Sequence, residues 1–382
     1  MTIDIISIIA CVIIIVFVAI SVFANPFMRK IQKDDIDDRL VDDENLPKIT
    51  VLVLANNNAE ALDNRLPLIL TQDYAPGYEV VVVGEQGDMQ TETVLKQFAQ
   101  NKHLYVTYAP SHSLFMSKKK LAVALGVKAA HNEWIVLVNS NCRPQSDTWL
   151  LSMARHMDKD ANLVIGYSNY NNETKPYYRF DRLRNDCYLL RRADNGIAYR
   201  ANGTNIAFRR SEFVANDGYR GNLQFVNGEY DFIINKYAQP YSTRIAIEEE
   251  AWVREDVPSS KQWHDRNISF AHIRQYLDHA AMLRCIYNTD MLLMHANYVL
   301  LVAALVLSAI FQYWIVLAVA AAGLIATVAV RTISAKKVYE AFGEDIKGWK
   351  TVFYEISIVW HSWATKIRYA KSDKRDFTTH KL

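Results

Sequence analysis

Two long apolar segments limit what this 382-residue chain can fold into. Residues 5–24 carry no charge and are long enough to cross a bilayer, which takes about 20 residues. No basic stretch precedes them, so we interpret them as a retained anchor rather than a signal peptide. Residues 291–330 form a second apolar block, long enough for two spans, with an aromatic turn at residues 311–314. A helical hairpin buried in a soluble protein is the alternative interpretation.

Basic residues orient these spans. They follow the first span and the last one: Arg29, Lys30, Lys33, Arg331, Lys336 and Lys337. Because such flanks prefer the cytoplasm, we expect a multi-pass protein of the cell inner (cytoplasmic) membrane whose globular part and tail both face the cytoplasm. The formal net charge of +2 gives no sign of nucleic-acid binding. The four cysteines are scattered, which argues against a zinc site or a disulfide framework and fits a reduced compartment.

Strands and helices alternate after a short acidic stretch. Strands are predicted at residues 49–54, 79–83, 104–108 and 134–138, and helices at 60–70, 91–99 and 118–130. Short strands that alternate with longer helical patterns predict an α/β fold with a mostly parallel sheet. Beyond residue 149 the pattern predicts strands at 164–167 and 205–208, and helices at 231–237 and 272–285.

The whole chain is predicted to have five segments. They are an N-terminal transmembrane anchor (1–25), an acidic linker (26–47), an α/β domain (48–290), two transmembrane helices (291–330) and a cytoplasmic amphipathic tail (331–382). Aromatic and basic residues alternate between residues 349 and 368, which is typical of a helix that lies in the membrane interface. An ordinary helix packed against the domain is the alternative.

Four stretches of the α/β domain resemble the membrane-anchored family 2 glycosyltransferases. They are ITVLVLANNNAEALDNRLPLILTQDYAPGYEVVVV at 49–83, SKKKLAVALGVKAAHNEWIVLVNSNC at 117–142, YRANGTNIAFRRSEF at 199–213 and GEYDFIINKYA at 228–238. No stretch is diagnostic alone, but together they cover about residues 48–270, and the transmembrane layout fits as well.

The resemblance implies a GT-A fold with a Rossmann-like nucleotide half. It implies transfer of a sugar, with inversion, from a nucleotide sugar (a UDP-sugar) to a lipid-linked or cell-envelope glycan acceptor. In such a site Mg²⁺ or Mn²⁺, which prefer carboxylate oxygens, would neutralise the diphosphate leaving group. A carboxylate would take the proton of the acceptor hydroxyl.

Matching positions assign roles to individual residues. The resemblance places Asn57, Glu85, Lys119 and Asn139 at the nucleotide, and Gly203, Thr204, Asn205, Gln262, Trp263 and Arg266 on the acceptor side. The candidates for the catalytic base are Asp231 and Glu229, the acids on either side of the family's base position, and Asn141 alone is the candidate metal contact, through its carbonyl oxygen. The order of Gln262, Trp263 and Arg266 departs from the family's Gln-x-x-Arg-Trp element, which argues against processive polymer synthesis.

Acids are missing where the family's chemistry needs them. Asn139 and Asn141 stand where the family carries Asp-x-Asp, and Tyr230 stands at the position of the usual base. Residues 139–141 could instead form only a turn that bonds to its own backbone, and Asp231 could be only a charge at a helix start. A run of lysines at 118–120 opens a helix near the expected diphosphate, where cations could replace part of a metal's charge.

The sequence is therefore compatible with two functions. The first is a membrane-bound transferase that uses a nucleotide sugar. The alternative is a catalytically impaired pseudo-glycosyltransferase that acts as a binding or assembly partner of an active transferase. A cation transporter is disfavoured because no charged group lies inside the predicted spans.

Overall fold

The computed structural model describes residues 4–378 except 30, 32–42, 56 and 114. Most of the predicted acidic linker lies outside these described residues. The chain forms two compact units. We call Met1–Ile31, Lys175–Tyr188 and Ala280–Ala364 the helical unit, and Gln32–Thr174, Leu189–His279 and Thr365–Leu382 the sheet unit.

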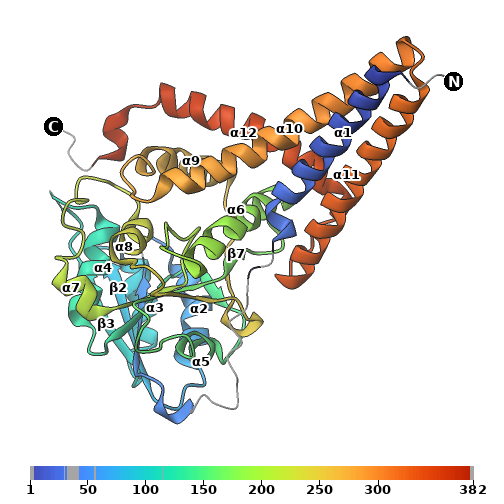
Figure 1. The fold of residues 1–382 in the computed structure, drawn as a ribbon. Coiled ribbons are helices and arrows are strands. Elements are labelled where there is room, and N and C mark those ends of the chain that lie inside the picture. The colour runs from blue at the N-terminus through green and yellow to red at the C-terminus, as the bar shows by residue number, and fades with distance from the viewer. Residues whose placement is uncertain (1–3, 30, 32–42, 56, 114, 379–382) are drawn as a thin grey trace. The chain divides into compact units, whose positions relative to one another are not determined.

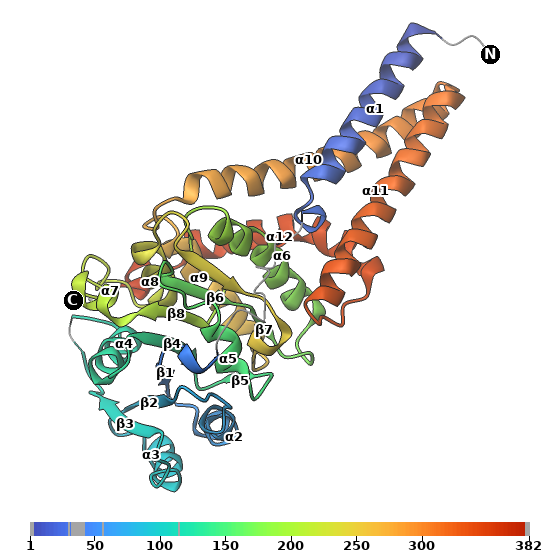
Figure 2. The same ribbon diagram turned by 60° about the horizontal axis from the view of Figure 1, so that its bottom comes forward.

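A seven-stranded sheet organises the sheet unit (Figure 2). Its order is β3 (Leu104–Ala109), β2 (Tyr78–Glu85), β1 (Ile49–Leu54), β4 (Trp134–Asn139), β8 (Ile206–Arg209), β6 (Leu163–Gly166) and β9 (Thr243–Ala246). The first four strands run parallel, and β8 is antiparallel to both of its neighbours. The predicted mostly parallel sheet is therefore confirmed.

Alternating side chains let helices cover both faces of this sheet. Val51 and Val53 belong to a buried cluster on one face of the sheet. Side chains of α2 (Ala59–Leu70), α3 (Met89–Gln97) and α5 (Trp149–Ala154) pack in this cluster. Leu52 points to the other face, toward α4 (Lys118–Ala129), where a Cβ on Gly126 would lie 2.1 Å from a Leu52 methyl carbon. Glycine at 126 thus lets α4 approach the strands closely.

The sheet unit contains a second, smaller sheet and three further helices. A second sheet has the order β5 (Cys142–Pro144), β10 (Val253–Glu255) and β7 (Ser168–Tyr170). Three helices accompany it: α7 (Arg210–Ala215), α8 (Glu229–Tyr237) and α9 (Ser260–Ile273).

The helix predicted at residues 272–285 is wrong. α9 ends at Ile273 and the next helix, α10, begins only at Ala280. Between them His279 has a φ of 61°, a left-handed conformation that a continuous helix does not tolerate. No glycine or proline between residues 274 and 279 marks the break.

Three helices of the helical unit are long and apolar enough to cross a membrane: α1 (Ile5–Ala24), α10 (Ala280–Ile310) and α11 (Trp314–Ala341). They pack side by side, with Ile14, Leu301 and Ala320 in their shared core (Figure 1). The two C-terminal helices extend beyond the apolar block predicted at 291–330, toward residue 280 and toward residue 341. The unit also holds the first part of α6 (Pro176–Asp194) and most of α12 (Thr351–Lys371).

Buried charges tie α12 to these helices. The Arg331 guanidinium lies 2.9 Å from the Glu355 carboxylate and donates to the Ser21 carbonyl at 2.8 Å. Arg184 pairs with Asp290 at 2.5 Å, and all four charged side chains of these two pairs are nearly inaccessible to solvent. A buried charge of this kind is tolerated only while its partner is present.

We predict that Arg331→Met destabilises the helical unit by about 3–5 kcal/mol, because Glu355 then keeps a buried charge without its closest partner. Thermal unfolding of the purified full-length protein in detergent measures this change. The matched control is Lys336→Met on the same helix, since Lys336 and Glu340 form a solvent-exposed pair. Equal midpoints for the two variants would contradict the prediction.

Candidate functional site

A cavity of about 590 Å³ opens at the carboxyl end of β4. The strand order reverses between β1 and β4, and open α/β sheets bind ligands at such a switch point. The cavity wall includes the end of β4, the start of α8, one face of α9 and the loop before β8. All of these elements belong to the sheet unit.

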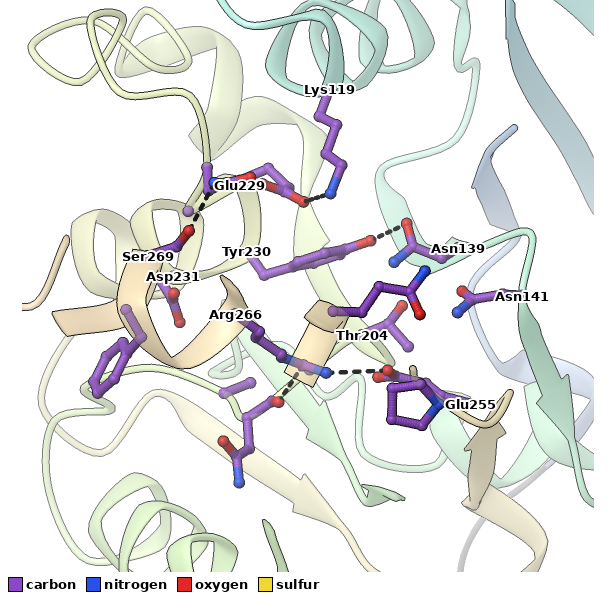
Figure 3. A pocket seen from close by; sticks show the side chains of 18 of the residues that line it. Lys119, Asn139, Asn141, Thr204, Glu229, Tyr230, Asp231, Glu255, Arg266 and Ser269 are labelled. Atoms are coloured by element: carbon purple, nitrogen blue, oxygen red, sulfur yellow. Dashed lines mark hydrogen bonds and ion pairs between the residues drawn. The ribbon is translucent and has the colours of Figure 1, made fainter. Parts of the chain in front are cut away.

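A hydrogen bond joins the two positions that lack the expected acids. The Tyr230 hydroxyl donates to the Asn139 side-chain oxygen at 2.5 Å. Figure 3 shows the Tyr230 ring between the Glu229–Lys119 pair and Arg266, with its hydroxyl turned to Asn139. Burial raises the pKa of Tyr230 well above its usual value, so the phenol stays neutral and keeps the proton that it donates.

Two carboxylates at the start of α8 are the acids nearest to Tyr230 in sequence. Glu229 lies 3.4 Å from the Lys119 ammonium, which comes from the first turn of α4. Asp231 lies 3.5 Å from Arg200, in the segment that precedes β8. Burial raises the pKa of Asp231, the Arg200 guanidinium opposes this shift, and the Glu229 charge adds to it. A carboxylate with a raised pKa in a cleft is a candidate proton acceptor.

A third acid–base pair completes the wall. The Arg266 guanidinium lies 3.2 Å from the Glu255 carboxylate and donates to the Tyr170 hydroxyl at 3.1 Å. Glu255 ends β10, and Tyr170 ends β7, which is the parallel neighbour of β10. Sequence reasoning missed Glu255 and Tyr170, because neither stands in a motif and only the second sheet brings them together. It also missed Arg200, which lies in the family-like stretch 199–213 but meets Asp231 only through the tertiary fold.

Most residues singled out from the sequence line this cavity. They are Lys119, Asn139, Asn141, Gly203, Thr204, Glu229, Asp231, Gln262 and Arg266. The Gln262 side-chain oxygen also accepts from the Ser259 backbone N–H, which makes Gln262 part of the capping box of α9. The functional roles of these residues stay predictions.

Four predicted site residues do not line the cavity: Asn57, Glu85, Asn205 and Trp263. Asn205 is fully buried, where its side chain accepts from Trp149 and donates to the Tyr167 and Ala251 carbonyls. No polar atom of this side chain remains for an acceptor sugar. Trp263 is likewise a buried side chain.

The two nucleotide candidates of this group lie at the ends of β1 and β2. Glu85 forms an ion pair with Lys118. The Asn57 backbone N–H donates to Asp88 at 3.1 Å, and Asn57 itself adopts a φ of 46°. Asp88 also caps α3 through Thr91, so its contact with Asn57 holds the loop that follows β1.

The residues at the end of β4 do not fit a divalent cation. The Asn139 oxygen already accepts from Tyr230, and the Asn141 oxygen accepts from the Cys142 thiol at 3.6 Å. Within the part of the chain that the structure describes, no three His, Cys, Asp or Glu side chains are grouped so that they could hold a metal ion. Hard cations need several oxygen ligands, preferably carboxylates, so the metal contact predicted for Asn141 finds no partners.

We predict that Tyr230→Phe and Asn139→Ala are energetically coupled by about 1 kcal/mol, the usual net contribution of a hydrogen bond. Chemical denaturation of the full-length protein and of both single variants and the double variant gives the coupling. Tyr237→Phe with Asn139→Ala is the matched cycle, because the Tyr237 hydroxyl bonds to the Gly218 carbonyl instead. Additive effects in the first cycle would show that the bond contributes nothing.

Comparison with known proteins finds a family profile that matches part of the chain. Residues 50–214 match the profile of Glycosyl transferase family 2. No curated protein sequence matches the chain. Among solved structures, the mannosyltransferase PcManGT of Pyrobaculum calidifontis, in complex with GDP-Man and Mn²⁺, has a TM-score of 0.51 at 17% identity. The alignment covers 96% of this chain and 98% of that one.

Two structures of S. aureus TarS residues 1–349, with UDP-GlcNAc and with UDP, are more distant. Their TM-scores are 0.42 and 0.41, their identities 13% and 14%, and each alignment covers 82% of this chain and 92% of TarS. Scores at this level do not establish a common fold, so the fold assignment rests on the family profile, the mannosyltransferase and the sheet topology. This chain carries a family 2 glycosyltransferase domain with a GT-A fold, together with three helices long and apolar enough to span a membrane.

Proposed function

We propose that this protein transfers a sugar from a nucleotide sugar to a lipid-linked or cell-envelope glycan at the cytoplasmic face of the inner membrane. UDP-sugars are the first donors to test, and GDP-mannose is the second because PcManGT was solved with GDP-Man. The observation that carries the proposal is a family 2 domain whose cavity, at the switch point of the sheet, holds a carboxylate with a raised pKa.

The proposed reaction is a direct displacement with Asp231 as the base. The acceptor oxygen forms a bond to the anomeric carbon while the bond from that carbon to the diphosphate breaks. The electron pair leaves with the nucleoside diphosphate, and the acceptor proton passes to Asp231. Arg200, 3.5 Å away, orients this carboxylate. Glu229 is the other base considered, but it is paired with Lys119.

A second function is favoured by one observation, the Tyr230–Asn139 bond. The bond places the neutral phenol of Tyr230 at the position of the family's base. It also occupies the side-chain oxygen of Asn139, which stands at the first position of the family's Asp-x-Asp motif. In this alternative the chain keeps the pocket but not the reaction, and serves as a binding or assembly partner of an active transferase.

We predict that Asp231→Asn lowers the transfer rate of the full-length protein in lipid nanodiscs at least about a hundredfold, the usual contribution of a general base. Release of UDP or GDP in the presence of a membrane-lipid extract from the source cells measures the rate. Asp217→Asn, at an exposed pair with Arg220, is the control and should keep the wild-type rate. A rate unchanged in Asp231→Asn would contradict the assignment, and no transfer by the wild type would favour the second function.

The pH dependence gives a separate check. The base must be deprotonated, so the rate should rise as pH rises through the pKa of Asp231, which burial holds above the usual value for aspartate. Arg200→Met should move this rise to higher pH, because the guanidinium favours the charged carboxylate. A pH profile that Arg200→Met leaves in place would argue for another base.

The proposed membrane location is supported by one face of α12. The exposed large side chains Phe353, Ile356, Trp360 and Trp363 recur at steps of three and four residues, so they share one face, and exposed Trp349 lies just before the helix. The opposite face is buried and held by the Arg331–Glu355 pair. Lys350, Lys366 and Lys371 add positive charge, which suits an anionic lipid surface.

We predict that Trp360 and Trp363 insert into the lipid headgroup region. The measurement is the fraction of tryptophan fluorescence that brominated lipids quench when the protein is in vesicles. The double variant Trp360→Phe, Trp363→Phe should have a clearly smaller quenched fraction than the wild type. Trp252→Phe, a buried residue of the sheet unit, is the control and should leave the quenched share unchanged. Quenching that survives the double replacement would place this face of α12 away from the lipid.

A further inference from the structure

We infer that the cavity binds the diphosphate of its nucleotide directly, through amide and ammonium N–H groups at the end of β4 and the start of α4, without a divalent cation. This inference rests on the proposed function, since it assumes that the ligand is a nucleotide sugar. It departs from the metal that the family resemblance implies.

The first step concerns the oxygen atoms at the end of β4. A cation would need the side-chain oxygens of Asn139 and Asn141. The first accepts a 2.5 Å hydrogen bond from Tyr230, and the second accepts from the Cys142 thiol at 3.6 Å. Both oxygens therefore already accept hydrogen bonds within the protein, whereas the amide nitrogens of the two residues remain as donors toward the cavity.

The second step concerns those nitrogens. Both asparagines line the cavity, and among the described residues neither amide nitrogen has a hydrogen-bond partner. An amide nitrogen carries two N–H donors, and donors bind phosphate oxygens rather than cations. Lys119 lies on the same wall with a half-exposed side chain, and its ammonium has further N–H donors for a phosphate while it stays beside Glu229.

The third step is the charge of the cavity wall. Four of its carboxylates are matched by cations: Glu229 by Lys119, Asp231 by Arg200, Glu255 by Arg266 and Asp256 by Arg65. The fifth, Asp265, is exposed to solvent. Metal affinity depends on the number of charged ligands, and four of the five acids of this wall are already paired with arginine or lysine.

The test uses the full-length protein in nanodiscs. Titration calorimetry with UDP, GDP and inorganic pyrophosphate is run in EDTA and in Mn²⁺, and free Mn²⁺ is followed by electron paramagnetic resonance without nucleotide. We expect a nucleoside diphosphate to bind with a Kd that differs less than about twofold between EDTA and Mn²⁺. We also expect the protein alone to leave the free Mn²⁺ signal unchanged.

Variants then assign the contacts. Lys119→Met should weaken diphosphate binding about tenfold or more, the equivalent of one charge-assisted hydrogen bond. Lys128→Met, an exposed lysine at the other end of α4, is the matched control and should change Kd less than about twofold. The triple variant Asn139→Asp, Asn141→Asp, Tyr230→Phe supplies two carboxylates and removes the hydroxyl that donates to the side chain at position 139. This triple variant should gain Mn²⁺ binding, and the pair of aspartates with Tyr230 retained should gain less.

The outcomes separate this inference from the proposed function. Binding of UDP or GDP only with Mn²⁺, or Mn²⁺ binding by the wild type that Asn139→Ala with Asn141→Ala removes, would overturn the inference and leave the proposed function standing. Failure of UDP, GDP and pyrophosphate to bind in EDTA and in Mn²⁺ alike would overturn both.

Discussion

β4 (Trp134–Asn139) is the strand on which the rest of the site depends. It pairs in parallel with β1 and antiparallel with β8, and the register sets Asn139 beside Leu54 at the edge of the sheet. Its core residues are fully buried, so the strand cannot shift by one position without turning them out of the core. The position of Asn139 in turn fixes where the Tyr230 hydroxyl, and with it the start of α8, can lie.

Neutralisation of charge within the protein is common to both units. In the cavity each buried carboxylate faces a lysine or an arginine, and in the helical unit Arg331 and Arg184 face Glu355 and Asp290. In a low-dielectric setting an unpaired ion is far more costly than a paired one. A site built in this way has little unbalanced charge with which to attract a metal, and its neutral asparagine–tyrosine pair adds none.

The sequence predicted the fold well because the fold follows from local patterns. Short apolar strands that alternate with helices led to the parallel sheet, and uncharged runs led to the three long apolar helices. The end of β4 and the start of α8 were also found, because motifs mark both. The sequence could not show that Tyr230 bonds to Asn139, since 91 positions separate them and no pattern of period or charge connects them.

Other parts of the site depend on tertiary contacts alone. Glu255 meets Arg266 only because β10 pairs with β7, and Asn205 turns out to support the core rather than the cavity. The break between α9 and α10 depends on the backbone at His279, a residue type that carries no signal for it.

In our proposal, the residues that replace the family's acids bind a diphosphate directly. Diffraction at the manganese absorption edge, from crystals grown with a nucleoside diphosphate and Mn²⁺, tests it most directly. We expect a diphosphate within hydrogen-bond distance of the Asn139 and Asn141 amide nitrogens and of the Lys119 ammonium, with no anomalous peak beside it. An anomalous peak between the diphosphate and the side-chain oxygens of Asn139 and Asn141 would contradict it.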